Sequence, residues 1–281
     1  MVLNYGEGNL RDYLQNNHSK LTLKDRIAIF RDLCDSLYYI HEKYLIHCDL
    51  HSGNILIDYS GSCFITDFGL CGPVDEESSS KIYGIIPYIA PEVLQGKKNT
   101  KQSDVYSIGM LMWEIFAGRP PFDDRPHGPG LCLKICEGLR PPLLLSNMPT
   151  DYVQMMEKCW DTDPSKRPTI EELLDFVEDK LKEICENENL GINENNDSDD
   201  NNNSSSNSQQ TYKSHPLAYH TSRILEDIID QFKHLKIITS NSSIPKIDSN
   251  EPKNNTSNDS SLNELDVDLT TLNAVFNKGE L

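Results

Sequence analysis

An Asp and an Asn five residues apart carry the first chemical signal of this sequence. Asp49 and Asn54 stand in the run I-H-C-D-L-H-S-G-N over residues 46–54. A carboxylate and an amide in one short loop can accept a proton from a hydroxyl nucleophile and bind a hard cation. A structural loop closed by an Asx turn accounts for the same two residues equally well. The pair by itself therefore leaves both interpretations open.

A second carboxylate follows in the run Asp67-Phe68-Gly69. A carboxylate at the end of a strand supplies oxygen ligands of the kind that Mg²⁺ prefers, and Gly69 permits a sharp turn after it. Further along the chain, Glu92 and Arg167 are the residue types of a buried bidentate ion pair, with a surface placement as the alternative.

These residues need a helix and a hairpin to position them. Residues 21–44 repeat apolar side chains at helical spacing, which predicts a helix before the loop of Asp49. Apolar runs at 55–57 and 64–65 flank the turn-like D-Y-S-G and predict a hairpin after it. We expect the two carboxylates and the amide to converge on one pocket.

The rest of the first two thirds of the chain predicts further helices. Residues 105–116 are apolar nearly all round, which indicates a buried helix, and 131–137 and 152–160 are shorter candidates. Thr169 and Glu172 form a capping-box pattern at the start of a last helix. The predicted fold class is mainly α, a helical bundle with a small β-hairpin.

Together these residues resemble the eukaryotic-type protein kinase family. Its catalytic loop H-R-D-L-x-x-x-N, its metal motif D-F-G and the A-P-E that ends its activation segment match residues 47–54, 67–69 and 90–92. The run S-D-V-Y-S-I-G over 103–109 is similar to the family's buried helix anchor. The resemblance extends from residue 1 to about residue 187 and indicates the C-terminal lobe of a kinase.

The resemblance implies a role for each matched residue. Asp49 is the catalytic carboxylate that orients the substrate hydroxyl. Asn54 and Asp67 hold the Mg²⁺ ions that bridge the phosphates of ATP, and Leu56 packs beneath the adenine ring. The resemblance also implies two structural roles. Asp104 anchors the backbone of the catalytic loop, and Glu92 and Arg167 form a buried ion pair.

The first ten residues look like the family's hinge and the start of the helix after it. The backbone of Asn4 and Gly6 is then placed to bond adenine. No Gly-rich phosphate loop and no V-A-I-K lysine occur before the hinge, so we expect the N-terminal lobe to be missing. Phosphoryl transfer depends on positioning, so the chain alone is expected to be a poor kinase.

Three residues depart from the family pattern: Cys48 replaces the usual arginine, His51 replaces a lysine, and Ile85 replaces a threonine. The Pro87-Tyr88 context favours serine/threonine over tyrosine as the acceptor, while Cys159-Trp160 resembles the tyrosine-kinase-like branch. The leading hypothesis is transfer of the ATP γ-phosphoryl group to a protein hydroxyl. The alternatives are a kinase-derived pseudoenzyme or protein-interaction module, and a fragment with no function of its own.

The chain is acidic throughout, with a formal net charge of −18 over 281 residues. This charge argues against nucleic acid or an anionic membrane as the main partner. Eight cysteines lack any C-x-x-C pair, and no secretory signal or apolar run long enough to cross a membrane occurs. We therefore expect thiols without a structural metal and an intracellular, cytoplasmic location.

The composition changes sharply near residue 190. Residues 1–189 are expected to form the kinase lobe, and 190–281 a largely disordered Asn/Ser-rich tail. Within this tail, 222–238 shows helical spacing of Ile224, Ile228, Phe232 and Leu235, which predicts a short amphipathic helix. A protein partner would bind at the exposed face of the lobe or at the tail.

Overall fold

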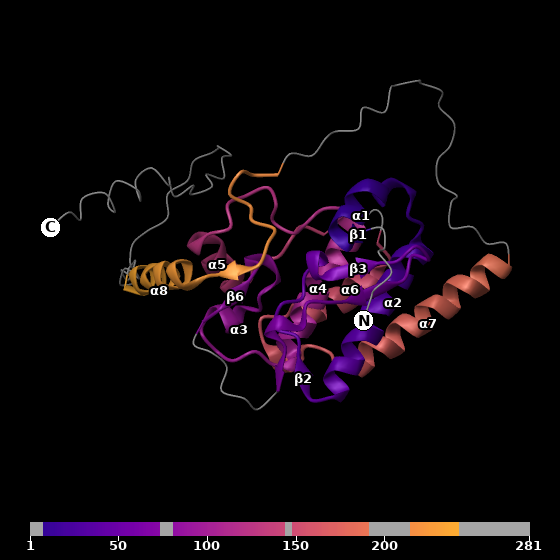
Figure 1. Cartoon of the computed structure of the whole chain (residues 1–281), viewed down its shortest axis with the longest axis horizontal. Helices are drawn as coiled ribbons and strands as arrows, with labels where there is room; N and C mark the ends of the chain where they lie inside the picture. The colour runs from indigo at the N-terminus through magenta and orange to yellow at the C-terminus, as the bar shows by residue number, and fades with distance from the viewer. Residues whose placement is uncertain (1–7, 74–80, 144–147, 191–213, 242–281) are drawn as a thin grey trace, which may run out of the picture. The chain divides into compact units, whose positions relative to one another are not determined.

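The computed structural model describes residues 8–73, 81–143, 148–190 and 214–241. These residues lie within one compact unit of the chain and are mainly helical, with small antiparallel sheets (Figure 1). The prediction of a mainly helical fold with a hairpin is confirmed. The polar stretch 193–210, expected to be disordered, lies outside the described residues.

A three-stranded antiparallel sheet supports the candidate site. Its strands, in the order β1-β3-β4, are β1 (Gly8–Asn9), β3 (Ile55–Ile57) and β4 (Cys63–Ile65). Asp58 closes the turn between β3 and β4, since its Oδ1 accepts hydrogen bonds from the backbone N–H groups of Ser60 and Ser62 at 2.8 and 3.0 Å. The predicted hairpin is therefore present, with one further strand paired to it.

Two shorter antiparallel pairs complete the sheets of the described residues. The first pairs β2 (Leu45–Ile46) with β5 (Gly72–Pro73). The second pairs β6 (Tyr83–Gly84) with β7 (Arg223–Ile224), which are far apart in the sequence. This second pair joins the described part of the tail, residues 214–241, to the segment that precedes Glu92.

The α-helices follow the predicted order. They are α1 (Leu10–Asn17), α2 (Leu23–Glu42), α3 (Pro91–Leu94), α4 (Lys101–Ala117), α5 (Pro129–Cys136), α6 (Thr150–Cys159), α7 (Ile170–Asn189) and α8 (Glu226–Asn241). Short 3₁₀ turns lie between them: η1 (His18–Lys20), η2 (Ser52–Asn54), η3 (Phe68–Leu70), η4 (Ile86–Tyr88) and η5 (Pro164–Lys166).

Capping boxes set the starts of the three long helices α2, α4 and α7. The cap residues are Thr22, Thr100 and Thr169. At the predicted box of α7, the Thr169 N–H donates to Glu172 Oε2 at 2.7 Å, and the Glu172 N–H donates to Thr169 Oγ1 at 3.3 Å. Each box satisfies two backbone donors that a helix start leaves unpaired.

Helix α4 forms the centre of the apolar core. It is buried on nearly every side, as its sequence predicted, and packs against α2 and α6. Helix α7 covers another face of α2. Because α4 is fixed by this packing, the polar residues in its first turn are held rigidly, and they anchor the loop described below.

The tail segment 214–241 packs on the lobe, with α8 beside α5 (Figure 1). The expected helix over 222–238 begins only at Glu226, because the two residues of β7 are extended. Ile224, assigned from the sequence to the apolar stripe, is 47% exposed. The buried stripe is instead Leu225, Ile229 and Phe232, one position off the expected register at its start.

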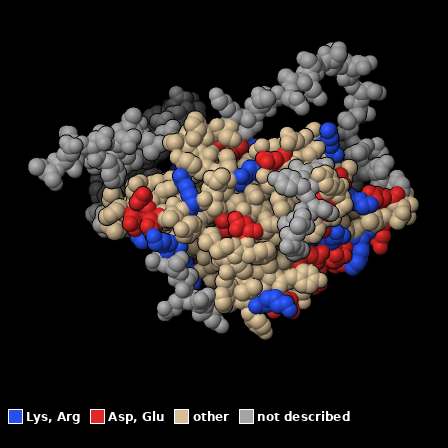
Figure 2. All heavy atoms as spheres, in the orientation of Figure 1, with Lys and Arg blue, Asp and Glu red and all other residues tan. Residues whose placement is uncertain are grey.

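No helix of the described residues is long and apolar enough to cross a membrane. On the face shown in Figure 2, acidic and basic side chains are interspersed, and the described Lys and Arg residues form no continuous basic patch.

Candidate active site

The loop between β2 and β3 is held by the first turn of α4. Asp104, which is buried, accepts hydrogen bonds from the backbone N–H groups of His47 and Cys48 at 2.8 and 3.1 Å. His41 Nε2 lies 3.0 Å from the same carboxylate. This contact holds Cys48 in a left-handed conformation, with φ of 69°. The expected anchoring role of Asp104 is confirmed.

Asp49 and Asn54 are in direct contact across this loop. The Asn54 Nδ2 donates to the backbone oxygen of Asp49 at 3.0 Å and to its Oδ2 at 3.2 Å. The 3₁₀ turn η2 brings the two residues together. Asn54 is thereby oriented with its amide nitrogen toward Asp49, which leaves its amide oxygen for another ligand.

The Asp49 side chain is buried but carries a low pKa. Burial alone would raise the pKa of this carboxyl, but the hydrogen bond and charge of His51, with a hydrogen bond from Ser222, outweigh it and lower the pKa. The carboxylate is therefore ionised at neutral pH and available as a hydrogen-bond acceptor.

His51 is oriented toward Asp49 by its own backbone. Its Nδ1 accepts a hydrogen bond from the Gly53 N–H at 3.0 Å, so in the neutral ring the proton lies on Nε2. Nε2 lies 3.7 Å from Asp49 Oδ2 and 2.9 Å from Ser222 Oγ. His51 thus faces the Asp49 carboxylate with a hydrogen-bond donor.

The loop is tied to the end of β4, where Asp67 follows. His47 Nδ1 accepts from the Asp49 N–H at 3.3 Å, so its Nε2 donates to the Thr66 oxygen at 3.0 Å. The Thr66 N–H and hydroxyl both donate to the backbone oxygen of Asn54, at 2.8 and 2.9 Å. Thr66 therefore contacts both His47 and Asn54, and Asp67 is the next residue in the chain.

Asp67 itself is exposed and has a left-handed backbone, with φ of 60°. Its Oδ1 accepts a hydrogen bond from the Gly69 N–H at 3.3 Å. A non-glycine residue in this conformation is uncommon and costs free energy, which is typical of functional positions.

The donor set suits Mg²⁺. The exposed carboxylate of Asp67 and the amide of Asn54 both offer oxygen ligands, and Mg²⁺ commonly keeps several waters and phosphate oxygens around one or two protein ligands. Among the described residues, no group of three or more His, Cys, Asp or Glu side chains is arranged to hold a metal ion.

Leu56 lies on β3, the central strand of the three-stranded sheet. It pairs with Asn9 on one side and with Phe64 on the other. Leu56 is half-buried and Phe64 is 50% exposed, whereas their neighbours on β3 and β4 point into the core. An apolar surface suited to an aromatic ring therefore remains open. The proposed hinge residues Asn4 and Gly6 lie outside the described residues.

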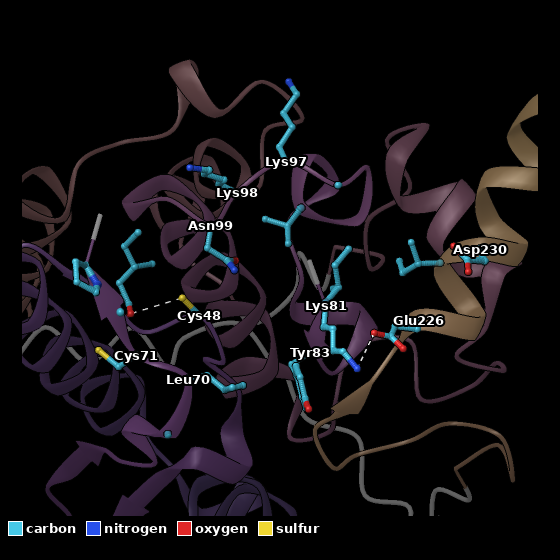
Figure 3. Close-up of a pocket in the computed structure, with 18 of the residues that line it drawn as sticks. Cys48, Leu70, Cys71, Lys81, Tyr83, Lys97, Lys98, Asn99, Glu226 and Asp230 are labelled. Carbon is cyan, nitrogen blue, oxygen red and sulfur yellow. Dashed lines mark hydrogen bonds and ion pairs between the residues drawn. The ribbon is translucent and has the colours of Figure 1, made fainter. Parts of the chain in front are cut away.

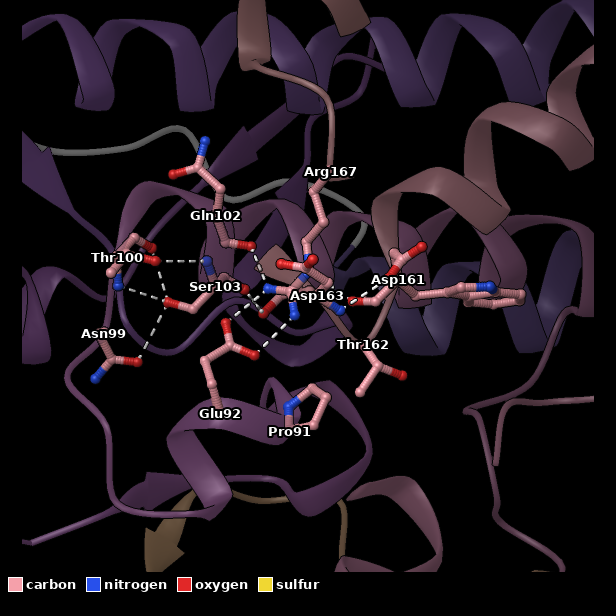
Figure 4. A network of polar contacts seen from close by, with 12 residues as sticks. Pro91, Glu92, Asn99, Thr100, Gln102, Ser103, Asp161, Thr162, Asp163 and Arg167 are labelled. Atoms are coloured by element: carbon pink, nitrogen blue, oxygen red, sulfur yellow. Dashed lines mark hydrogen bonds and ion pairs between the residues drawn. The ribbon is translucent and has the colours of Figure 1, made fainter. Parts of the chain in front are cut away.

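The predicted ion pair of Glu92 and Arg167 is present and buried (Figure 4). The Arg167 Nη1 and Nη2 donate to Glu92 Oε1 and Oε2, both at 2.7 Å. Arg167 also donates to the backbone oxygens of Asp161 and Gln102 at 2.9 and 2.8 Å. These four hydrogen bonds join α3, the first turn of α4 and the segment before α7, so the role of Arg167 is structural.

A pocket of about 990 Å³ lies beside the loop, lined by β5, the segment before β6, and α8 (Figure 3). Cys48 contributes to its wall, and burial, followed by the charge of Asp104, raises the pKa of this thiol to about 12. Lys81 is paired with Glu226 across the pocket at 3.1 Å. Cys48 therefore presents a neutral thiol where the family pattern has an arginine.

One residue beside Asp49, Ser222, carries no signal in the sequence. The hydroxyl of Ser222 donates to Asp49 Oδ1 at 2.7 Å, although the two residues are 173 positions apart. A serine in a polar, serine-rich tail has no local signal for this position. The pairing of β7 with β6 helps to bring Ser222 to the loop of Asp49.

His127 binds the tail on the N-terminal side of Ser222. Its Nε2 donates to the Phe122 oxygen at 3.0 Å, and its Nδ1 accepts from the Tyr219 N–H at 3.1 Å. Burial lowers the pKa of His127 and outweighs the hydrogen bonds to the Phe122 and Tyr219 backbone, which raise it; the charge of Arg223 then lowers the pKa and that of Asp124 raises it. The neutral ring is the form that makes both hydrogen bonds.

Acid is therefore expected to loosen the tail. Burial, and then the charges of Arg11 and His127, lower the pKa of His220 to about 4 from an ordinary value of 6.5. A histidine with a lowered pKa in the docked state takes up a proton more readily when released, so docking is strongest above pH 6.5 and weakens as the pH falls toward 4.

The measurement is amide hydrogen exchange at Leu225, whose N–H donates to the Ile82 oxygen at 3.0 Å. After correction for intrinsic chemical rates, its protection should fall as the solution is acidified. The double variant His127→Asn with His220→Asn should flatten this dependence. Protection that is constant across this range in the unmodified protein would contradict the prediction.

Comparison with known proteins supplies an independent finding. The family model described as protein tyrosine and serine/threonine kinase matches residues 1–177. The dual specificity protein kinases zakA and splA of Dictyostelium discoideum are each 31% identical, over 63% and 60% of this chain. The inactive tyrosine-protein kinase kin-32 of Caenorhabditis elegans is 31% identical over 64% of it. The matches span 24%, 8% and 21% of those relatives.

Proposed function

The chain belongs to the protein tyrosine and serine/threonine kinase family, and from that premise we propose that it transfers the γ-phosphoryl group of ATP to a protein hydroxyl. One observation carries the proposal: the ionised carboxylate of Asp49 accepts a hydrogen bond from a serine hydroxyl at 2.7 Å. This is the contact that a catalytic carboxylate makes with its substrate.

Each of the proposed residues has a defined role in the transfer. Asp49 orients the attacking hydroxyl and takes up its proton as the new bond to phosphorus forms. His51, whose Nε2 faces the same hydroxyl, fixes its direction. Asn54 and Asp67 would hold Mg²⁺, which neutralises charge on the phosphates. Leu56 would lie against adenine, whose edge the backbone of Asn4 and Gly6 would bind.

A serine or threonine is the favoured acceptor. The hydroxyl that reaches Asp49 in the structure belongs to a short side chain, Ser222, immediately before the strand β7. A tyrosine hydroxyl lies much further from its backbone, so the strand would have to lie further from the loop. The names of zakA and splA include dual specificity, so tyrosine stays a second acceptor for the test. Residues 1–189 are the proposed kinase lobe.

A second function is a kinase-derived interaction module without catalysis. The neutral thiol of Cys48 favours it, since the arginine of the family pattern cannot be replaced by a thiol in binding an anion. The relative kin-32 is named as inactive. Such a module would keep the lobe and its tail contacts while transferring no phosphate.

The test uses the protein expressed from its complete coding sequence. It should transfer phosphate from Mg-ATP to a library of peptides containing serine, threonine or tyrosine, and Mg-ATP should raise its melting temperature. Asp67→Asn should remove both effects, because the metal loses its charged ligand. Asp175→Asn, on the exposed face of α7, is the matched control and should keep both. A folded protein that shows neither effect is the result expected of the interaction module.

A further inference from the structure

Ser222 stands where the hydroxyl of a protein substrate has to be. Its Oγ lies between two groups of the catalytic loop, at 2.7 Å from Asp49 Oδ1 and 2.9 Å from His51 Nε2. Because the His51 proton lies on Nε2, the order of donation runs from His51 to Ser222 and from Ser222 to Asp49. As a residue, Ser222 is exposed.

The backbone beside Ser222 is bound as an added strand. Arg223 and Ile224 pair antiparallel with Gly84 and Tyr83, and the register is continued when the Leu225 N–H donates to the Ile82 oxygen. Strand addition of this kind is a common mode of peptide recognition, in which main-chain hydrogen bonds hold the peptide regardless of its side chains.

Gly84 allows the strand to come this close to the catalytic carboxylate. Its φ is +132°, a conformation that side chains rarely adopt, and a Cβ there would lie 3.4 Å from Asp49 Oδ1 and 3.1 Å from Ile89 Cδ1. Gly84 therefore both pairs with the tail strand and borders the catalytic loop.

Anchors on both sides of Ser222 fix its position. On the N-terminal side, Arg11 Nη1 donates to the His220 oxygen at 2.5 Å, and Tyr219 is bound by His127. Arg223 donates to the His127 oxygen at 3.2 Å and stacks on the Tyr219 ring.

On the C-terminal side, Leu225 and the α8 residues Ile229 and Phe232 are buried, and α8 packs on α5 of the lobe. Three kinds of contact therefore hold the tail on the lobe. They are the buried apolar side chains, the β6–β7 strand pair and the hydrogen bond from the Ser222 hydroxyl to the catalytic carboxylate.

We propose that residues 219–225 occupy the protein-substrate site of their own chain and that Ser222 is a phosphoacceptor within it. This inference rests on the proposed function and names a substrate of that same site. In the reaction, Ser222 Oγ forms a bond to Pγ of ATP, and the bond from Pγ to the β,γ-bridging oxygen breaks with its electron pair passing to ADP. The hydroxyl proton goes to Asp49 and then to water.

Transfer should also release the segment. A phosphoserine carries a charge of about −1.5 to −2 at neutral pH. Placed against the buried Asp49 carboxylate, this charge is repelled. The tail therefore blocks the site until it is modified, and then leaves it open to other substrates.

The experiment follows the phosphate by mass spectrometry in the protein expressed from its complete coding sequence and incubated with Mg-ATP. Ser222 should be labelled with a rate constant that is independent of protein concentration, because donor site and acceptor lie in one chain. Ser222→Ala should remove this label. Thr221→Ala is the matched control, since the neighbouring Thr221 is exposed, and it should keep the label.

A second variant, Ile229→Asp, undocks α8 without touching the catalytic loop. It should slow labelling of Ser222 at least several-fold and raise transfer to library peptides, because the site is vacated. Phosphate on library peptides with Ser222 unmodified, or labelling that rises with protein concentration, would overturn the inference and leave the proposed function standing. Phosphate on neither peptides nor tail would overturn both.

Discussion

Asp49→Asn is expected to lower the rate of phosphoryl transfer by about 10²- to 10⁴-fold. The amide keeps the size of the side chain and can still accept a hydrogen bond, but it cannot take up the proton of the attacking hydroxyl. Asn54 would still be held through the backbone oxygen at position 49, to which it donates at 3.0 Å. The metal site should therefore survive, and the loss should fall on kcat rather than on the affinity for Mg-ATP.

The measurement is the steady-state rate with saturating peptide and Mg-ATP, with the melting temperature as a check on folding. Asp175→Asn removes one carboxylate from the exposed face of α7 and should leave the rate unchanged. If Asp49→Asn retained a rate within a few-fold of the unmodified protein, Asp49 would not be the group that receives the proton, and the proposed mechanism would be wrong.

Arg167→Met is expected to cost about 3–5 kcal/mol of stability, the usual loss when one partner of a buried ion pair is removed. The variant leaves the Glu92 carboxylate buried without its bidentate donor. It also frees the backbone oxygens of Asp161 and Gln102. The urea midpoint of unfolding should fall sharply, and catalysis would fail only through unfolding.

Lys182→Met provides the matched comparison, since it breaks an ion pair with Asp179 in which both side chains are largely exposed. Its cost should be at most about 1 kcal/mol. The double variant Arg167→Met with Glu92→Gln should recover part of the loss, because no charge is left buried and unpaired. Equal effects of Arg167→Met and Lys182→Met would show that burial does not strengthen the first pair.

Much of the fold could be predicted because its signals are local. The capping box of Thr169 and Glu172 and the Asp58 turn between β3 and β4 each depend on residues a few positions apart. The continuous apolar character of 105–116 likewise requires a buried helix wherever it packs. Local chemistry of this kind is nearly independent of the rest of the chain.

The tail shows where such reasoning fails. Periodicity placed Ile224 in a helix, yet it lies in a strand, because pairing with Tyr83 satisfies its backbone better than a first helical turn would. The strand shifts the buried face to Leu225 and Ile229. A short segment at the margin of helix stability takes the conformation that its tertiary contacts favour.

The sequence alone determined that Asp49, Asn54 and Asp67 are of the right types and in the right order for phosphoryl transfer. It also determined that Asp49 and Asn54 share one loop, since only five positions separate them. Tertiary structure decided what faces that loop: Asp104 behind it, and the hydroxyl of Ser222, 173 positions away, in front. Contacts over such separations arise from the packing of whole elements, and no spacing of residue types encodes them.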